Sequence, residues 1–149
     1  MSAQRTVTEK PAVVRRAVAE GRLTVRAETA RAIRAGTVAK GDPLAVAEIA
    51  GLQAMKRTAE LIPHCHNVPL TGSSVTATVV GRTVRVRATA ETVARTGVEM
   101  EALVGATTAL LTAWDMVKYL EKNERGLYPA TRLGPVRVVA KVKGEARSA

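Results

Sequence analysis

Four charged residues stand out in the segment from Thr96 to Lys122, because an ordinary structural helix would not need them. Glu99 and Glu101 lie at its start, and Asp115 and Lys118 follow about four turns later. An acid three residues before a lysine shares a helix face with it, and carboxylates beside an ammonium group are suited to proton transfer. The same pattern also fits a solvated helix face that carries one Asp–Lys pair.

Both histidines and the only cysteine lie between Pro63 and Pro69, in the run His64, Cys65 and His66. Three functional interpretations remain open. Imidazole and thiolate are good zinc ligands, although carboxylates would have to complete the shell. A cysteine nucleophile with a histidine base is the second interpretation, and a loop that presents His66 as a proton donor or acceptor is the third. An exposed histidine and a small buried cysteine would need no function.

The net charge of +10 predicts an anionic partner, which would be nucleic acid, an anionic membrane surface or a phosphorylated small molecule. No glycine-rich phosphate loop is present, so phosphate binding would depend on scattered cations. Lys40, Lys56 and Lys118 lie beside candidate loops or helix faces. Arg15 is the one charged member of the apolar face of a predicted strand. An arginine there reaches water at a strand end or, less commonly, points into a site.

These residues need elements to position them, and the chain predicts a strand, two helices, a hairpin, a long helix and a last strand. Asp42 and Pro43 mark a helix start, and Gly81-Arg82 fits a type II′ hairpin turn. This order favours an α+β two-layer sandwich, with an antiparallel sheet and helices on one face, most simply ferredoxin-like. The predicted ranges are strand 12–26, helices 28–35 and 43–60, hairpin 75–80 and 83–89, helix 96–122 and strand 135–143.

Length and composition favour one domain over residues 1–149, with a flexible arm at 1–11 and a flexible tail at 144–149. There is no Phe, one Trp and two Tyr, so Val, Ala and Leu must form the core, and oligomer formation would add useful burial. The single cysteine fits a reducing compartment. The N-terminus lacks an apolar signal core, and the apolar run 102–113 is too short for a membrane span. We expect a soluble cytoplasmic protein.

Several motifs together resemble one known family. The chain contains Lys40-Gly41-Asp42, then Lys56-Arg57-Thr58 followed by LIPHCH, then TGVEMEAL, and finally WDMVK. In this order and spacing they are similar to cyclic pyranopterin monophosphate synthase, the molybdenum cofactor biosynthesis protein C family. The similarity extends from about Val13 to Lys141. Where the family usually reads CHPL, this chain reads Cys65-His66-Asn67-Val68.

The resemblance implies conversion of 3′,8-cyclo-7,8-dihydro-GTP to cyclic pyranopterin monophosphate with release of pyrophosphate. It implies a ferredoxin-like fold, a hexamer built as a trimer of dimers and a site at a subunit interface. No resident metal or redox cofactor is implied, although Mg²⁺ can accompany the triphosphate. The residues implied as catalytic are Asp115, Lys118, Lys40 and His66, and those implied as substrate-binding are Cys65, His66, Glu99, Met100, Glu101, Lys56 and Arg15.

Spacing along the long helix adds a physical argument. Glu101 and Asp115 are 14 residues apart in the sequence, which is about 21 Å along a straight helix. If both ends serve one reaction, they must come from different subunits, so we expect composite sites. Two alternatives are a small basic RNA-binding module and an inactive family member that acts as a partner protein. The scarcity of aromatic residues argues against binding nucleic acid by base stacking.

Overall fold

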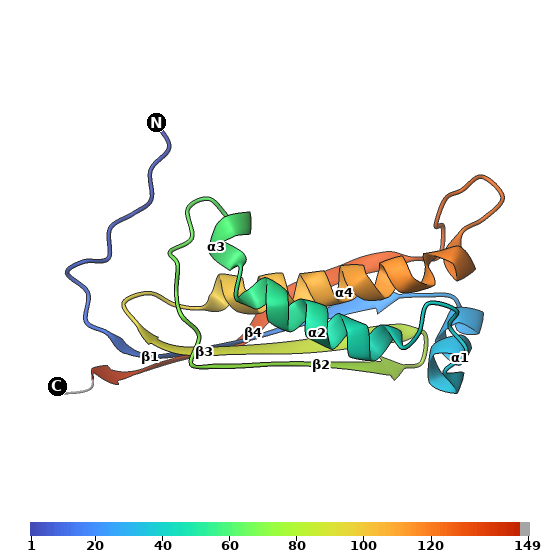
Figure 1. Ribbon diagram of the computed structural model, residues 1–149, viewed down its shortest axis with the longest axis horizontal. Coiled ribbons are helices and arrows are strands. Elements are labelled where there is room, and N and C mark those ends of the chain that lie inside the picture. Colours follow the sequence, from blue (N-terminus) through green and yellow to red (C-terminus); the bar gives the residue numbers. More distant parts are fainter. Residues whose placement is uncertain (147–149) are drawn as a thin grey trace.

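The computed structural model describes residues 1–146 and contains a four-stranded antiparallel sheet in the order β2-β3-β1-β4. The long helices α2 and α4 lie together on one face of this sheet (Figure 1). The predicted ferredoxin-like α+β fold is therefore confirmed. In chain order the elements are β1 (Val13–Thr24), α1 (Ala27–Ala35), α2 (Pro43–Met55), α3 (Thr58–Leu61), β2 (Gly72–Val80), β3 (Thr83–Ala94), α4 (Glu99–Glu121) and β4 (Arg132–Ala146).

The core lies between the sheet and the two long helices, and it is built from small apolar side chains. On β1, every second residue from Val13 to Leu23 is buried toward the helices, as the period of a strand requires. Ala106, Ala109 and Leu110 of α4 are fully buried against them. The absence of Phe is thus accommodated by close approach of the backbones rather than by large side chains.

Close approach is clearest where α2 crosses α4 at Gly51 and Gly105. A Cβ atom on Gly51 would lie 2.9 Å from the carbonyl oxygen of Gly105, and a Cβ atom on Gly105 would collide with Met55. At Gly105, α4 therefore packs against α2 of the same chain. It is not available there for a neighbouring subunit.

The predicted start of α2 and the hairpin turn are both found. The Asp42 carboxylate accepts hydrogen bonds from the backbone N–H groups of Leu44 and Ala45, and Pro43 occupies the first helical position. Gly81 has a φ of 59°, and no residue other than glycine has positive φ in residues 1–146. Positive φ at the first central residue and negative φ at the second, Arg82, are what a type II′ turn requires.

The predicted strands and helices are all found, with ends shifted by up to five residues from the predicted ranges. The helix predicted over 43–60 ends at Met55, and a short helix follows from Thr58 to Leu61. The Thr58 hydroxyl donates to the carbonyls of Ala54 and Met55, which competes with continuation of the helix. The last strand extends to Ala146, three residues beyond the predicted end, and residues 147–149 lie outside the described part of the chain.

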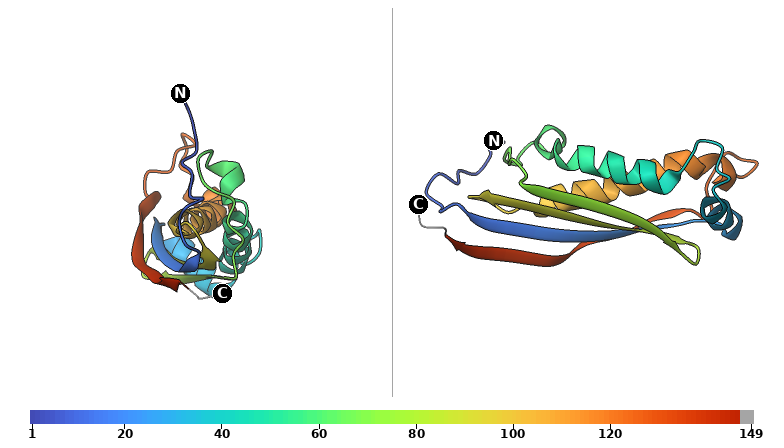
Figure 2. Two further views of the ribbon diagram at one scale, coloured as in Figure 1. Left: turned by 90° about the vertical axis from the view of Figure 1, so that its left-hand side faces the viewer. Right: turned by 60° about the horizontal axis from the view of Figure 1, so that its bottom comes forward.

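The face of the sheet opposite the helices is left uncovered, as Figure 2 shows. Exposed residues on this face alternate with buried ones along β2 and β3. Among the helices of residues 1–146, none is long and apolar enough to cross a membrane.

Candidate active site at the two ends of α4

The candidate residues form two groups at opposite ends of α4. One group surrounds Glu99 and Glu101 in the first turn, and the other surrounds Asp115 and Lys118 near the last turn. Figure 1 places these ends at opposite sides of the molecule, with the first turn close to the N-terminal arm. A single chain therefore does not bring the two groups together, as the spacing argument predicted.

At the C-terminal end of α4, Asp115 holds two ammonium groups. Its carboxylate lies 2.6 Å from Lys118 Nζ and 3.2 Å from Lys40 Nζ, and Lys40 also donates to the Asp115 backbone carbonyl. Hydrogen bonds from Lys118 and Lys40 lower the pKa of the Asp115 carboxyl group, and Asp115 in turn raises the pKa of Lys118. The arrangement presents two fixed positive charges beside an ionised carboxylate, which suits a phosphorylated ligand.

Burial lowers the pKa of a lysine, but Lys118 is not in that situation within one chain. The Lys118 side chain is half-exposed, and its bond to Asp115 acts in the opposite direction. In the single chain Lys118 is therefore an ammonium group, suited to donating a proton or neutralising phosphate rather than to accepting a proton.

The loop that carries Lys40 is fixed to α4 by a backbone contact. The N–H of Ala39 donates to the hydroxyl of Tyr119, at 2.8 Å. On the other side, Trp114 packs edge-to-face on Tyr128, with 5.7 Å between ring centroids. The Ala39–Tyr119 hydrogen bond holds the loop where Lys40 lies beside Asp115, although 75 residues separate these two in the sequence.

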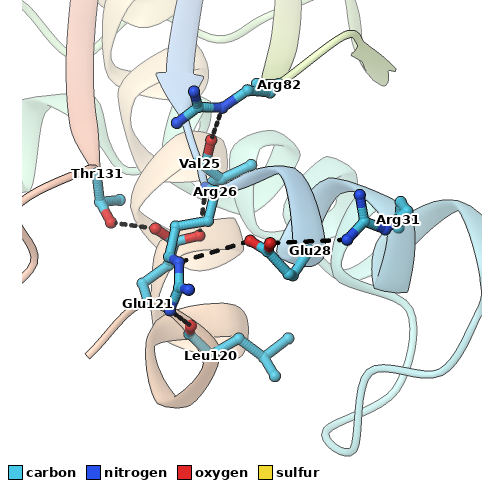
Figure 3. Close-up of polar contacts among 8 residues, drawn as sticks. All are labelled: Val25, Arg26, Glu28, Arg31, Arg82, Leu120, Glu121 and Thr131. Carbon is cyan, nitrogen blue, oxygen red and sulfur yellow. Dashed lines mark hydrogen bonds and ion pairs between the residues drawn. The ribbon is translucent and has the colours of Figure 1, made fainter. Parts of the chain in front are cut away.

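Glu121 anchors the same end of the helix. Its carboxylate is 1% exposed and accepts from the backbone N–H of Arg26 at 2.7 Å and from the Thr131 hydroxyl at 2.6 Å. Figure 3 shows how this carboxylate joins the end of β1 to the loop that precedes β4. A buried carboxylate with satisfied hydrogen bonds is a structural brace, and it keeps the last turn of α4 in place.

At the opposite end, a cavity of about 170 Å³ lies between the histidine loop and the first turn of α4. Glu101 is only 4% exposed, and burial raises the pKa of its carboxyl group. Burial and the nearby Glu101 likewise raise the pKa of the Cys65 thiol, which opposes a role as a thiolate nucleophile. The predicted residues that line this cavity include Cys65, His66, Glu99, Met100 and Glu101.

Glu99 is surrounded by cations. Burial acts to raise the pKa of its carboxyl group, but the hydrogen bond and charge of Lys141, together with the nearby Arg15 guanidinium, lower it below the ordinary value. Arg15 is 9% exposed, and its Nε atom has no hydrogen-bond partner among the described residues. Arg15 is therefore buried near Glu99 and does not extend into water.

Gly97 gives the Glu99 carboxylate its place. A Cβ atom on Gly97 would collide with Glu99 Oε2 and would lie 2.8 Å from its Cδ atom. The glycine in the TGVEME motif is therefore explained by close approach of a side chain, since its backbone does not have positive φ.

The N-terminal arm covers the histidine loop. His66 Nε2 lies 2.7 Å from the backbone carbonyl oxygen of Arg5, and His64 Nε2 lies 2.6 Å from the Ser2 hydroxyl. Arg95 holds the arm farther along by donating to the carbonyls of Thr8 and Lys10. Because a carbonyl oxygen can only accept a hydrogen bond, His66 Nε2 carries the proton and donates it to the Arg5 carbonyl in this arrangement.

Two further expectations concern metal and Lys56. Within residues 1–146, no group of three or more His, Cys, Asp and Glu side chains is placed to hold a metal ion, so the zinc interpretation of the His64–His66 run gains no support. Lys56 is exposed at the end of α2, and it forms no hydrogen bond or ion pair with a described residue of either group.

Lys141 belongs to the first-turn group, and the sequence did not reveal it. On β4, Val138 pairs with Ala19 while Ala140 pairs with Val18, so one extra residue interrupts the alternation. This bulge turns Lys141 toward the helices and Glu99, whereas strict alternation would turn it outward. Lys141 pairs with Ala17 and so lies on the same side of the sheet as Arg15, but this pairing is known only from the structure.

Comparison with known sequences now identifies the family. A sequence model of the MoaC family matches residues 4–144. The chain belongs to the MoaC family. Every predicted site residue lies inside the matched segment.

The curated relatives are close and cover most of each chain. A probable cyclic pyranopterin monophosphate synthase of Thermococcus kodakarensis is 50% identical over 139 residues, covering 93% of this chain and 89% of the relative. A protein of the same name from Archaeoglobus fulgidus is 51% identical over 138 residues, covering 93% and 88%. A third, from Methanosphaerula palustris, is 49% identical over 138 residues, covering 93% and 90%. The similarity therefore extends across the sheet, both long helices and both ends of α4.

Proposed function

We propose that this chain is a cyclic pyranopterin monophosphate synthase of molybdenum cofactor biosynthesis. It would convert 3′,8-cyclo-7,8-dihydro-GTP to cyclic pyranopterin monophosphate and release pyrophosphate. Membership of the MoaC family and the names of its relatives support this activity. The structural observation that carries the proposal is the Lys40–Asp115–Lys118 group, which fixes two ammonium groups where a triphosphate can bind.

The cationic group serves the phosphoryl step. An oxygen of the substrate attacks the α-phosphorus, the bond from that phosphorus to the bridging oxygen of the β-phosphate breaks, and pyrophosphate leaves. Lys40 and Lys118 neutralise the charge that develops on the phosphate oxygens, and Lys118 donates a proton where one is needed. Asp115 holds both lysines and is not itself required to titrate, because its pKa is lowered.

The first-turn group serves the proton transfers of ring opening and reclosure. Glu101, with its raised pKa, can exchange a proton near neutral pH more readily than an ordinary glutamate. His66 is a second proton donor or acceptor, and its contact with the Arg5 carbonyl must open for it to reach a ligand. Arg15, buried and with a free Nε–H among described residues, supplies a fixed positive charge. The rearrangement is redox-neutral and needs no electron carrier.

The complete site forms between subunits in this proposal. The first-turn cavity of about 170 Å³ is smaller than the roughly 300 to 1,000 Å³ of typical ligand pockets, so one chain does not enclose a GTP-sized substrate. On α4, Leu111 is exposed between the two groups, and Met100 in the first turn and Tyr119 after Lys118 are exposed on the same broad face of the helix. A second chain that packs antiparallel on this face would bring its Lys118 to the Glu101 of the first. We propose a hexamer of three such dimers, acting in the cytoplasm.

Pyrophosphate release from the cyclised nucleotide is the direct test. Wild-type protein should release pyrophosphate and form the pyranopterin, whereas Lys118→Ala should be at least about 100-fold slower. Lys122→Ala, which removes an exposed lysine one turn later, is the matched control and should keep wild-type activity. Adding EDTA would show whether Mg²⁺ must accompany the triphosphate. Salt-sensitive retention of RNA without any pyrophosphate release would contradict the proposal.

A further inference from the structure

A second hollow lies on the face of the sheet that the helices leave uncovered. Its volume is about 480 Å³, and strands β1, β2, β3 and β4 all contribute to its lining. Figure 2 shows this face of the sheet without any helix over it. The pairing of β1 with β4 shifts register on either side of this region, between Val18 and Ala19 and between Gly21 and Leu23. Such irregularities increase local twist and help to hollow the surface.

The lining of this hollow is strongly basic. Four arginines and one glutamate give it a formal charge of +3. We call this hollow the outer-sheet groove, and its charged residues are Arg22, Arg85, Arg87, Arg137 and Glu20. Glu20 forms an ion pair with Arg87. The other three arginines form no ion pair and no side-chain hydrogen bond with any described side chain.

Strand register forces two of these charges together. Arg22 of β1 lies directly opposite Arg85 of β3, and Glu20 lies opposite Arg87. Like charges directly opposite on one face of a sheet destabilise the pairing. Thr78 and Thr76 of β2 lie opposite Arg85 and Arg87 and add hydroxyl groups to the same hollow. A bound anion would relieve the repulsion between Arg22 and Arg85.

We propose that the outer-sheet groove binds a small molecule that carries two or more phosphate groups. Guanidinium groups bind phosphate through paired N–H donors, and the hydroxyls of Thr76 and Thr78 add further donors. The volume falls within the range of small-molecule sites. The lining contains no aromatic residue, so the stacking on which single-stranded nucleic acid depends is missing. The groove shares no lining residue with the cavity beside Glu101.

Isothermal titration of the full-length protein with inorganic tripolyphosphate at low salt tests this site. Arg22→Gln with Arg85→Gln should weaken binding by at least about tenfold. Arg31→Gln with Arg57→Gln is the matched control, because it removes the same charge at exposed positions that pair with Glu28 and Glu60. The control should bind as wild type does. Equal affinity of all three proteins for tripolyphosphate would overturn the proposal. Lys40 and Lys118 are present in all three, so any binding there does not affect the comparison.

A substitution of opposite sign protects the test against misfolding. Glu20→Gln removes the carboxylate and frees Arg87, so tripolyphosphate should bind several-fold more tightly than to wild type. A damaged fold cannot produce that gain, and an unchanged or weaker affinity would count against the site. Titration with ATP in place of tripolyphosphate shows whether the wild-type site prefers a nucleotide or free polyphosphate. Either ligand should lose affinity in the Arg22/Arg85 variant. Preference for an RNA oligonucleotide, or a change of oligomeric mass in that variant with no anion binding, would overturn the proposal.

Discussion

Glu99 and Lys141 form an ion pair that joins the first turn of α4 to the edge strand β4. The Glu99 side chain is the more buried of the two, with 27% exposed against 56% for Lys141. Lys141 thus keeps a partly buried carboxylate ionised against the effect of burial. The pair also fixes β4 beside the proposed site, where Arg15 of β1 supplies a second cation.

Removing the Lys141 ammonium group should impair catalysis through Glu99. In Lys141→Met, burial acts on Glu99 without its main opposing partner, so its pKa rises and kcat/KM should fall by at least about tenfold. The acid limb of the pH–rate profile should move to higher pH, because Glu99 then ionises later. Lys141→Arg should restore most of the activity. Arg132→Met, at the start of the same strand, is the control, and an unaltered pH profile in Lys141→Met would refute the role.

Gly97 should be required for activity rather than for folding. The added methyl of Gly97→Ala would displace the Glu99 carboxylate, so we expect an activity loss of about tenfold to 100-fold with little change in Tm. Gly72→Ala is the control, because its Cβ would meet Glu91 at an ordinary 3.5 Å. Full activity in Gly97→Ala would show that the position of Glu99 is unimportant.

Local sequence signals predicted much of the fold and one pair of the candidate site residues. The Asp42-Pro43 cap, the Gly81 turn and the alternation of β1 are decided by neighbouring residues, and all are found. The Asp115–Lys118 pair is likewise local, since three residues separate its members. Such features depend on backbone preferences that operate within one turn or one strand.

Long-range packing decided the rest. Lys40 reaches Asp115 only because α2 and its preceding loop lie beside α4, which no local pattern encodes. Lys141 was missed because the sequence does not show the β4 bulge that turns this residue toward Glu99. The break in the helix after Met55 is local, since the Thr58 hydroxyl bonds the carbonyls of Ala54 and Met55, but the apolar pattern of the sequence did not indicate it.

Glu101 should reduce stability at neutral pH. Burial raises its pKa in the folded chain, so the folded state holds its proton more tightly than the unfolded state does. The free energy of unfolding then falls as the pH rises from the pKa of an unfolded glutamate to that of Glu101. Glu101→Gln cannot ionise, so its Tm should exceed that of wild type at pH 8 and equal it at pH 3, although activity falls about 100-fold. Thermal melts across this range check the sign, and Glu60→Gln, on an exposed side chain, should show no gain at pH 8.

Glu121 should matter for stability and not for chemistry. Glu121→Ala leaves the Arg26 N–H and the Thr131 hydroxyl without their buried acceptor, so we expect a loss of about 2 to 4 kcal/mol in the free energy of unfolding. Thr131→Val removes one of the two bonds and should cost about 1 kcal/mol. Urea unfolding measures both values. Glu124→Ala, three residues beyond Glu121 and exposed, is the control; a loss in that variant equal to that in Glu121→Ala would refute the brace.

Mixing two inactive variants tests the shared site. If each site takes Glu101 from one chain and Lys118 from another, Glu101→Gln and Lys118→Ala each inactivate every site alone. In a mixed dimer, one site carries both substitutions and the other carries neither. Equal mixing with free exchange therefore gives about one quarter of wild-type sites in a two-fold dimer. Pyrophosphate release should recover to about that fraction.

The control for this experiment pairs substitutions from the same end of α4. Lys40→Ala mixed with Lys118→Ala should remain inactive, because Asp115 holds both lysines in one chain and no mixed dimer has an intact set. Subunit exchange is verified by mass spectrometry of differently tagged chains. Recovery in both mixtures would point to exchange artefacts, and recovery in neither, with exchange verified, would mean that each chain works alone. The 14 residues between Glu101 and Asp115, about 21 Å along the helix, make that second outcome hard to reconcile with one reaction centre.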